Sequence, residues 1–222
     1  VQDVTAYHQC YYIGHKVGYP LYENTDVVFY KEAADGFHAQ IEEMKKAQKF
    51  IFMEYHAIED REAFAEMKAV LFAKAKEGVE IRIVYDDVGS VGFISPEFVK
   101  QMKAHGIDCR IFNPMMPVLN IFMNNRDHRK ITVIDGRVGF TGGYNLANEY
   151  FNITHPYGVW KDSGVRLEGE AVRSLTLIFM EMWNAIRDTD TEYEKYLPDG
   201  VFEAKGGGYV QPYACLLYTS DA

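Results

Sequence analysis

The sequence has no long hydrophobic run. None of its apolar stretches reaches the roughly 18 to 20 residues that a bilayer-spanning helix requires. The first residue, Val1, is neither an initiator methionine nor the start of a signal peptide. We therefore expect the native N-terminus to lie upstream of these 222 residues.

Cysteine is scarce. The three cysteines, Cys10, Cys109 and Cys215, are far apart in the chain and form no Cys-x-x-Cys arrangement. This pattern disfavours both a disulfide framework and a zinc site. A reducing compartment fits it best.

Basic residues are fewer than acidic ones. The chain has 23 Lys and Arg residues against 32 Asp and Glu residues, a formal net charge of −9. A molecule with this balance repels nucleic acid and anionic membrane surfaces unless its cations are gathered in one place. Any polyanionic substrate must therefore be bound locally.

The chain does contain a regular alternation of helical and strand-like segments. Hydrophobic residues make up 48% of it and aromatic residues 14%, which is enough for one sizeable core. The alternation predicts an α/β sandwich with a mixed, largely parallel central sheet. We expect helices at residues 37–49, 62–77, 96–106 and 170–187, and strands at residues 50–58, 79–87, 107–112, 130–134, 138–141 and 162–169.

The last of these helices carries an apolar stripe at helical spacing. Its members are expected to face the core: Val172, Leu175, Ile178, Phe179, Met182 and Trp183.

Residues 125–145, "NRDHRKITVIDGRVGFTGGYN", contain the strongest chemical signal. Residues two apart in a strand point to the same face, so His128 and Lys130 are expected to lie side by side. Positive charge from Lys130, Arg126 and Arg129 favours the neutral imidazole, the form that can attack an electrophile. The same cations favour a phosphoryl group as that electrophile.

A glycine pair and an asparagine follow the hairpin in this stretch. Gly142 and Gly143 would let the backbone approach closely and fold Asn145 back toward His128. An asparagine amide can donate to a second phosphate oxygen without adding charge.

The spacing of these residues resembles the signature of the phospholipase D superfamily. It reads His128-x-Lys130-x(4)-Asp135-x(6)-Gly142-Gly143-x-Asn145. The flanking stretches "IFMEYHAIED", "GVEIRIVYDDVGS", "WKDSGVRLEGEAV" and "FMEMWNA" resemble bacterial cardiolipin synthases, and the resemblance extends over residues 21–214. It implies a phospholipase D-like α/β/α fold and phosphatidyl transfer between two phosphatidylglycerol molecules, giving cardiolipin and glycerol.

The resemblance also implies roles for single residues. His128 would be the nucleophile that forms a phosphohistidine, and Lys130 and Asn145 would hold the phosphate oxygens. Asp162 would orient the imidazole through its other ring nitrogen, with Glu149 as the rival for that role. No metal or other cofactor is expected.

The remaining expected site residues support these. Asp135 is expected to act through the hairpin at residues 135–137 without touching substrate. Further substrate contacts are expected from Gly142, Gly143, Arg126 and Glu54.

The chain divides into four expected parts. Residues 1–24 would be a lead-in or linker, residues 25–197 a catalytic half, and residues 198–214 the start of a second half. Residues 215–222, "CLLYTSDA", resemble translated sequencing adaptor. The superfamily's mechanism uses two facing histidines and this chain has one such motif, so we expect a truncated fragment that is inactive, or nearly so, as a monomer.

The expected partners follow from the same resemblance. They are phosphatidylglycerol, the cytoplasmic face of a bacterial cell membrane, and either a second motif-bearing half or a homodimer partner.

Other interpretations stay open. One is a single-motif phosphodiesterase or nuclease that completes its site by homodimerisation, although the negative net charge makes nucleic acid an unlikely substrate. Another is a degenerate phosphate-binding scaffold. Zinc binding by His128 with Asp135 and Asp162 is disfavoured by the neighbouring cations.

The apolar run at residues 113–125 fits either a lipid-facing loop or a segment folded into the core. We assign no role to the other histidines, which are His8, His15, His38, His56, His105 and His155.

Overall fold

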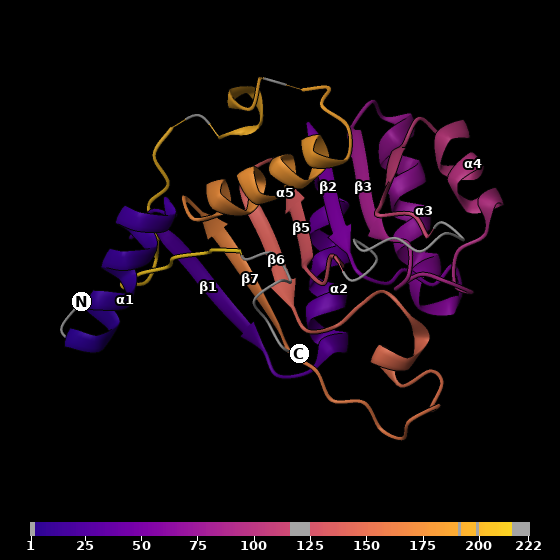
Figure 1. Cartoon of the computed structure of the whole chain (residues 1–222), viewed down its shortest axis with the longest axis horizontal. Helices are drawn as coiled ribbons and strands as arrows, with labels where there is room; N and C mark the ends of the chain where they lie inside the picture. The colour runs from indigo at the N-terminus through magenta and orange to yellow at the C-terminus, as the bar shows by residue number, and fades with distance from the viewer. Residues whose placement is uncertain (1–2, 116–124, 191, 199, 215–222) are drawn as a thin grey trace.

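The structure is a computed structural model that describes residues 3–115, 125–190, 192–198 and 200–214. Within these ranges seven strands form one sheet in the order β1-β7-β6-β5-β2-β3-β4 (Figure 1). The strands are β1 (Thr25–Tyr30), β2 (Phe50–Tyr55), β3 (Glu80–Asp86), β4 (Asp108–Phe112), β5 (Lys130–Ile134), β6 (Val138–Gly142) and β7 (Gly164–Gly169).

The sheet is mixed, as expected, but it is not largely parallel. Only β2 with β3 and β3 with β4 pair in parallel. The other four described pairings, β1–β7, β7–β6, β6–β5 and β5–β2, are antiparallel. The reason is local for β5 and β6, because a tight hairpin can only join antiparallel strands.

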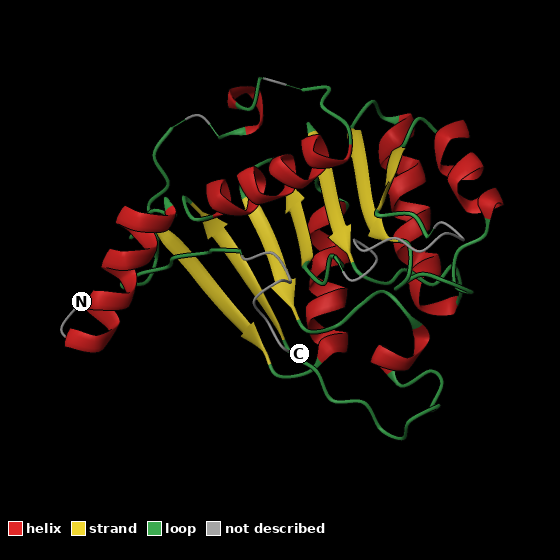
Figure 2. Cartoon of the chain, viewed as in Figure 1, coloured by secondary structure: helices red, strands yellow, loops and turns green. Residues whose placement is uncertain are grey.

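Helices cover both faces of this sheet (Figure 2). The helix α5 (Val172–Ile186) lies across one face, and α2 (Ala33–Met44) and α3 (Glu62–Lys76) lie behind the other in the view of Figure 1. The helix α4 (Pro96–Ala104) precedes the edge strand β4. Two short 3₁₀ turns, η2 (Asn148–Phe151) and η3 (Glu194–Tyr196), follow β6 and α5.

The N-terminal residues, expected to be a lead-in or linker, are helical. They form α1 (Val4–Tyr12), which continues as a π-helical turn, η1 (Ile13–Val17). Asp3 caps α1, since its carboxylate accepts a hydrogen bond of 2.7 Å from the backbone N–H of Ala6. The strand β1 was also absent from the elements that the sequence predicted.

Two apolar layers hold the helices to the sheet. One joins α2, α3 and α4 to the sheet face that carries Tyr55 and Phe140. The other joins α5 to the opposite face, and the predicted core residues of α5 are all buried there. That prediction is confirmed.

The strand directions bring one group of chain segments together. The last residue of β2, Tyr55, pairs with the first residue of β5, Lys130. The carboxyl end of β3 is alongside, because β3 runs parallel to β2. The segment 125–129, which leads into β5, therefore meets the carboxyl ends of two parallel strands, where sites of open α/β sheets gather.

Candidate active site

His128 lies just before β5 and not within it. The strand begins at Lys130, and residues 125–129 form neither helix nor strand. The β2–β5 ladder begins at Lys130, so strand geometry does not set His128 beside Lys130 as expected. The two side chains are neighbours all the same, since both line one cavity and the charge of Lys130 acts on the imidazole. The imidazole is exposed, and neither of its ring nitrogens has a hydrogen bond to another described residue.

The surroundings of His128 favour its neutral form. Partial burial lowers the pKa of the imidazole below its ordinary value, and the charges of Lys130 and His56 lower it further. Asp127 and Asp86 oppose this shift. A neutral imidazole keeps a lone pair for attack on an electrophile.

Lys130 is buried and directed to the backbone of the candidate nucleophile. Its ammonium donates a hydrogen bond of 2.6 Å to the carbonyl oxygen of His128. Burial lowers the pKa of Lys130 to about 8, although Asp127 and Asp162 raise it in part. The described residues include no ion-pair partner for this ammonium, so its charge is available to an incoming anion.

The two neighbouring arginines are neutralised by carboxylates. The Arg126 guanidinium donates to Asp86 Oδ1 at 3.1 Å. The Arg129 Nε lies 2.6 Å from Glu54 Oε1 and 3.1 Å from Asp127 Oδ1. The positive setting predicted around His128 therefore comes chiefly from Lys130.

Two residues that are expected to contact substrate, Arg126 and Glu54, make contacts within the protein. Arg126 also donates to the carbonyl oxygens of Asn113 and Asn125, both at 2.9 Å. Glu54 is fully buried beside Arg129, and burial together with Asp127 raises the pKa of Glu54 well above its ordinary value. Contact with substrate stays a prediction for both residues.

Asp135 lies at the hairpin, as expected. Its carboxylate accepts backbone N–H bonds from Gln48, Lys49 and Phe50 at 2.8 to 2.9 Å. Asp135 itself has a φ of 52° and Gly136 a φ of 67°, which the tight turn requires. The contact fixes the start of β2 against the β5–β6 turn.

Asp135→Ala is expected to lower the free energy of unfolding by about 3 kcal/mol, because three backbone donors lose a charged acceptor. Urea unfolding measures this. The matched control is Asp108→Ala, which removes an exposed carboxylate at the start of β4 and should change stability by less than about 0.5 kcal/mol. Equal losses in the two variants would contradict the structural role of Asp135.

The glycine pair serves packing against the start of β7. A Cβ at Gly143 would lie 2.0 Å from Asp162 Oδ1, and one at Gly142 would lie 2.6 Å from the carbonyl oxygen of Ser163. The close backbone approach predicted from these glycines is therefore an approach to residues 162 and 163, just before β7.

Asp162 is near Lys130 but is not bonded to His128. Its carboxylate accepts from the Ser163 N–H at 2.8 Å and from the Trp160 indole at 3.4 Å. Its charge acts on Lys130. The rival, Glu149, is in η2, where burial and the charge of Glu59 raise its pKa. An orienting contact with His128 stays a prediction for either residue.

Asn145 is buried, and its amide is held at both ends. Its Oδ1 accepts from the Ala57 N–H at 3.1 Å, and its Nδ2 donates to the Tyr150 hydroxyl at 2.8 Å. The amide retains a second N–H. Asn145 thus contacts Ala57, the residue that follows His56.

His56 is the main residue that sequence reasoning missed. It directly follows β2, and its ring centroid lies 4.9 Å from that of His128. The usable signal was its place at the carboxyl end of a strand, where polar side chains of α/β folds gather.

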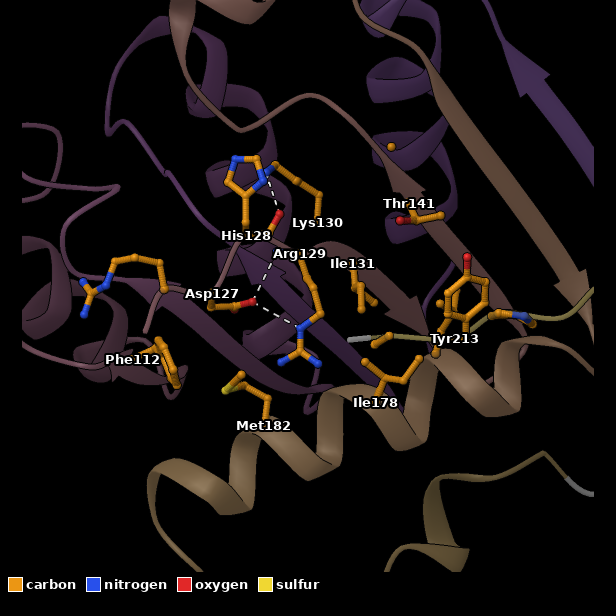
Figure 3. A pocket seen from close by; sticks show the side chains of 15 residues that line it. Phe112, Asp127, His128, Arg129, Lys130, Ile131, Thr141, Ile178, Met182 and Tyr213 are labelled. Carbon is orange, nitrogen blue, oxygen red and sulfur yellow. Dashed lines mark hydrogen bonds and ion pairs between the residues drawn. The ribbon is translucent and has the colours of Figure 1, made fainter. Parts of the chain in front are cut away.

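A cavity of about 360 Å³ opens beside this group (Figure 3). Its polar side carries Arg126, His128 and Lys130. Figure 3 shows His128 and Lys130 on the side away from α5, with Ile178 and Met182 of α5 facing them. The apolar wall is made by Phe112, Ile131, Leu175, Ile178, Met182, Pro212, Tyr213 and Ala214.

Three further findings are limited to the described residues. No helix there is long and apolar enough to cross a bilayer. No group of three or more His, Cys, Asp or Glu side chains there is placed to hold a metal ion. Most of the apolar run at residues 113–125, and the adaptor-like residues 215–222, fall outside the described ranges.

The fold is shared with solved phospholipase D family proteins. Nuc from Salmonella typhimurium, a phospholipase D family member, superposes with a TM-score of 0.55 at 18% identity, covering 77% of this chain and 100% of that one. NucT from Helicobacter pylori also gives a TM-score of 0.55, at 11% identity, covering 72% and 96%. This is a phospholipase D-like α/β fold.

The family model described as "Cardiolipin synthase, PLD-like domain" matches residues 40–183. The chain therefore belongs to the cardiolipin synthase family of phospholipase D-like domains.

Curated relatives agree with this membership. Cardiolipin synthase 2 of Staphylococcus epidermidis is 34% identical over 181 residues, covering 81% of this chain and 37% of that protein. An uncharacterized protein of Streptococcus mutans is 39% identical over 209 residues, covering 94% and 45%. The chain thus spans less than half the length of these relatives.

Proposed function

We propose that this chain is the catalytic half of a phosphatidyltransferase of the cardiolipin synthase type, with His128 as nucleophile. The observation that supports this most is the pairing of His128 with Lys130 at the edge of an apolar cavity. The His128 imidazole is exposed and favoured in its neutral form, and Lys130 has no ion-pair partner among the described residues. The cation suits a phosphate, and the apolar wall suits the hydrocarbon part of a lipid.

The proposed chemistry has two balanced steps. A ring nitrogen of His128 bonds to the phosphorus of phosphatidylglycerol, the P–O bond to the glycerol head group breaks, and the departing alkoxide takes up a proton. The hydroxyl of a second phosphatidylglycerol then attacks phosphorus and loses its proton, and the P–N bond breaks. The products are glycerol and cardiolipin, and His128 is regenerated.

Within this proposal, Lys130 and Asn145 stabilise the charge on the phosphoryl oxygens. For Lys130 this requires the ammonium to exchange its bond to the His128 carbonyl for one to phosphate. We assign the proton donor for the leaving alkoxide to a second motif outside this chain, and the membrane surface as the source of the lipid.

Vesicles of phosphatidylglycerol test the proposal. The protein at the length that its gene encodes is expected to release one glycerol for each cardiolipin formed. Formation of phosphatidic acid without cardiolipin would show hydrolysis and contradict the transferase assignment.

The runner-up is a phosphodiesterase or nuclease that works as a homodimer. One observation favours it: the match covers the whole of the Nuc chain, so Nuc consists of one phospholipase D-like domain comparable to this one. Nicking of plasmid DNA by a dimer of this chain, with no lipid transfer, would select it.

The chemistry of His128 can be followed in this chain with bis(p-nitrophenyl) phosphate. Because p-nitrophenolate leaves without an acid catalyst, one equivalent is expected to be released as His128 becomes phosphorylated, even if a second histidine is needed for lipid substrates. The size and rate of this burst measure nucleophilic attack alone.

The burst rate is expected to have a bell-shaped pH dependence. It should rise as His128 loses its proton, at a pH below the ordinary histidine value of about 6.5, and fall as Lys130 loses its charge near pH 8. Lys130→Arg, which stays charged, should shift the alkaline limb to higher pH. An alkaline limb unchanged by this substitution would contradict the assignment to Lys130.

A further inference from the structure

A second imidazole contacts the candidate nucleophile. The rings of His56 and His128 lie 4.9 Å apart between centroids, at an interplanar angle of 65°. The side chain of His56 is 22% exposed. This edge-to-face contact joins the end of β2 to the segment before β5.

His56 also holds the backbone next to His128. Its Nδ1 lies 2.7 Å from the carbonyl oxygen of Asp127. A carbonyl oxygen can only accept, so Nδ1 carries the proton in this contact. The bond is made to a segment that no helix or strand supports, since residues 125–129 precede β5.

Asp86, at the end of β3, binds the backbone N–H of Asp127, the same residue whose carbonyl oxygen contacts His56. Its buried carboxylate accepts from the Asp127 N–H at 3.0 Å and lies 3.9 Å from His56 Nδ1. Both backbone polar groups of Asp127 are therefore bound by side chains from the ends of two parallel strands. The residue before His128 is fixed from both sides.

The turn after β3 is shaped around the His56 ring. A Cβ at Gly89 would lie 2.6 Å from His56 Nε2 and 2.3 Å from the His56 carbonyl oxygen. Gly89 in turn donates its N–H to Asp86 Oδ1 at 3.0 Å. The absence of a side chain at this position makes room for the imidazole.

His56 is badly placed to act as the acid for the leaving group. In-line displacement puts the attacking and departing atoms on opposite sides of phosphorus. Two rings already in contact leave no room for a phosphoryl group between them. The geometry instead suits a supporting role.

We propose that His56 is a positioning residue for His128, acting through its hydrogen bond to the Asp127 carbonyl so that the nucleophile is presented in one orientation. This inference rests on the proposed function in one respect, the role of His128 as nucleophile. His56 itself does not contact the reacting phosphorus.

Three substitutions separate the hydrogen bond from the ring. His56→Asn keeps an N–H donor at about the position of Nδ1, His56→Phe keeps an aromatic ring without the donor, and His56→Ala removes both. The matched control is His105→Ala. His105 also contacts a backbone carbonyl through Nδ1, that of Gln101 at 2.9 Å, and stacks on Phe72, but it follows α4 away from the site.

The burst with bis(p-nitrophenyl) phosphate is expected to slow by about 10- to 100-fold in the Ala and Phe variants, with an unchanged half-saturating concentration. The Asn variant should stay within about threefold of the unmodified chain, as should the His105 control. A normal rate in the Ala or Phe variant would overturn the proposal. So would an Asn variant as slow as Ala, because the imidazole itself would then be required.

Relaxation of the His128 ring signals by NMR tests the same point without any activity. These signals are assigned by their loss in His128→Asn, and they should show greater fast motion in the Ala and Phe variants than in the Asn variant. An equally ordered His128 ring in every variant would overturn the proposal. A missing burst in the unmodified chain would instead count against the proposed function, and the NMR comparison would still decide the role of His56.

Discussion

His128→Asn is expected to reduce the burst of p-nitrophenolate by at least about 1,000-fold, because the attacking nitrogen is lost and no neighbouring group replaces it. Stopped-flow absorbance with bis(p-nitrophenyl) phosphate measures the rate. The fold should be unaffected, since the His128 side chain is exposed and its ring forms no hydrogen bond within the described residues.

His155→Asn is the matched control for this substitution. His155 is also exposed, in the chain between η2 and β7. Its replacement should leave the burst unchanged. A normal burst in His128→Asn would remove His128 from the reaction.

Lys130→Met is expected to slow the burst by about 100- to 1,000-fold, since one charged donor to the phosphoryl oxygens is lost. The same substitution should stabilise the fold. The folded-state pKa of Lys130, about 8, lies below the ordinary value, so below pH 8 its buried charge weakens the fold, and this cost disappears as the pH rises. At neutral pH the substitution should therefore raise the free energy of unfolding, by up to about 3 kcal/mol.

Lys45→Met provides the comparison, because Lys45 is exposed and its ion pairs with Glu42 and Glu66 lie at the surface. It should alter neither the burst nor the stability by much. If Lys130→Met lost activity and stability together, Lys130 would be a structural residue and its assignment to phosphate would fail.

Much of the fold could be predicted because its signals are local. The stripe on α5 and the hairpin at Asp135-Gly136-Arg137 depend on residues close in sequence. The direction of the strands could not be predicted in this way, since pairing β2 with β5 depends on contacts between distant segments. The strand β1 was missed because as an edge strand it exposes Val27 and Phe29, so it lacks the alternation of a half-buried strand.

The spacing of residues 128–145 located the site in the sequence, but it did not predict which side chains pair there. Sequence reasoning counted Arg126 and Arg129 as free cations, whereas Asp86 and Glu54 pair with them from other strands. These partners are remote in sequence, so only the fold reveals them. The contact of His56 with His128 depends on the same pairing of β2 with β5.

The chemical identity of the covalent intermediate shows whether His128 is the nucleophile. The unmodified chain is mixed with bis(p-nitrophenyl) phosphate, quenched in alkali, where phosphohistidine is stable, and digested for mass spectrometry. We expect the peptide containing His128 to gain one p-nitrophenyl phosphoryl group, on the imidazole, in proportion to the p-nitrophenolate released. Release of p-nitrophenolate with His128 unmodified, or with the group on another residue, would contradict the role of His128 as nucleophile.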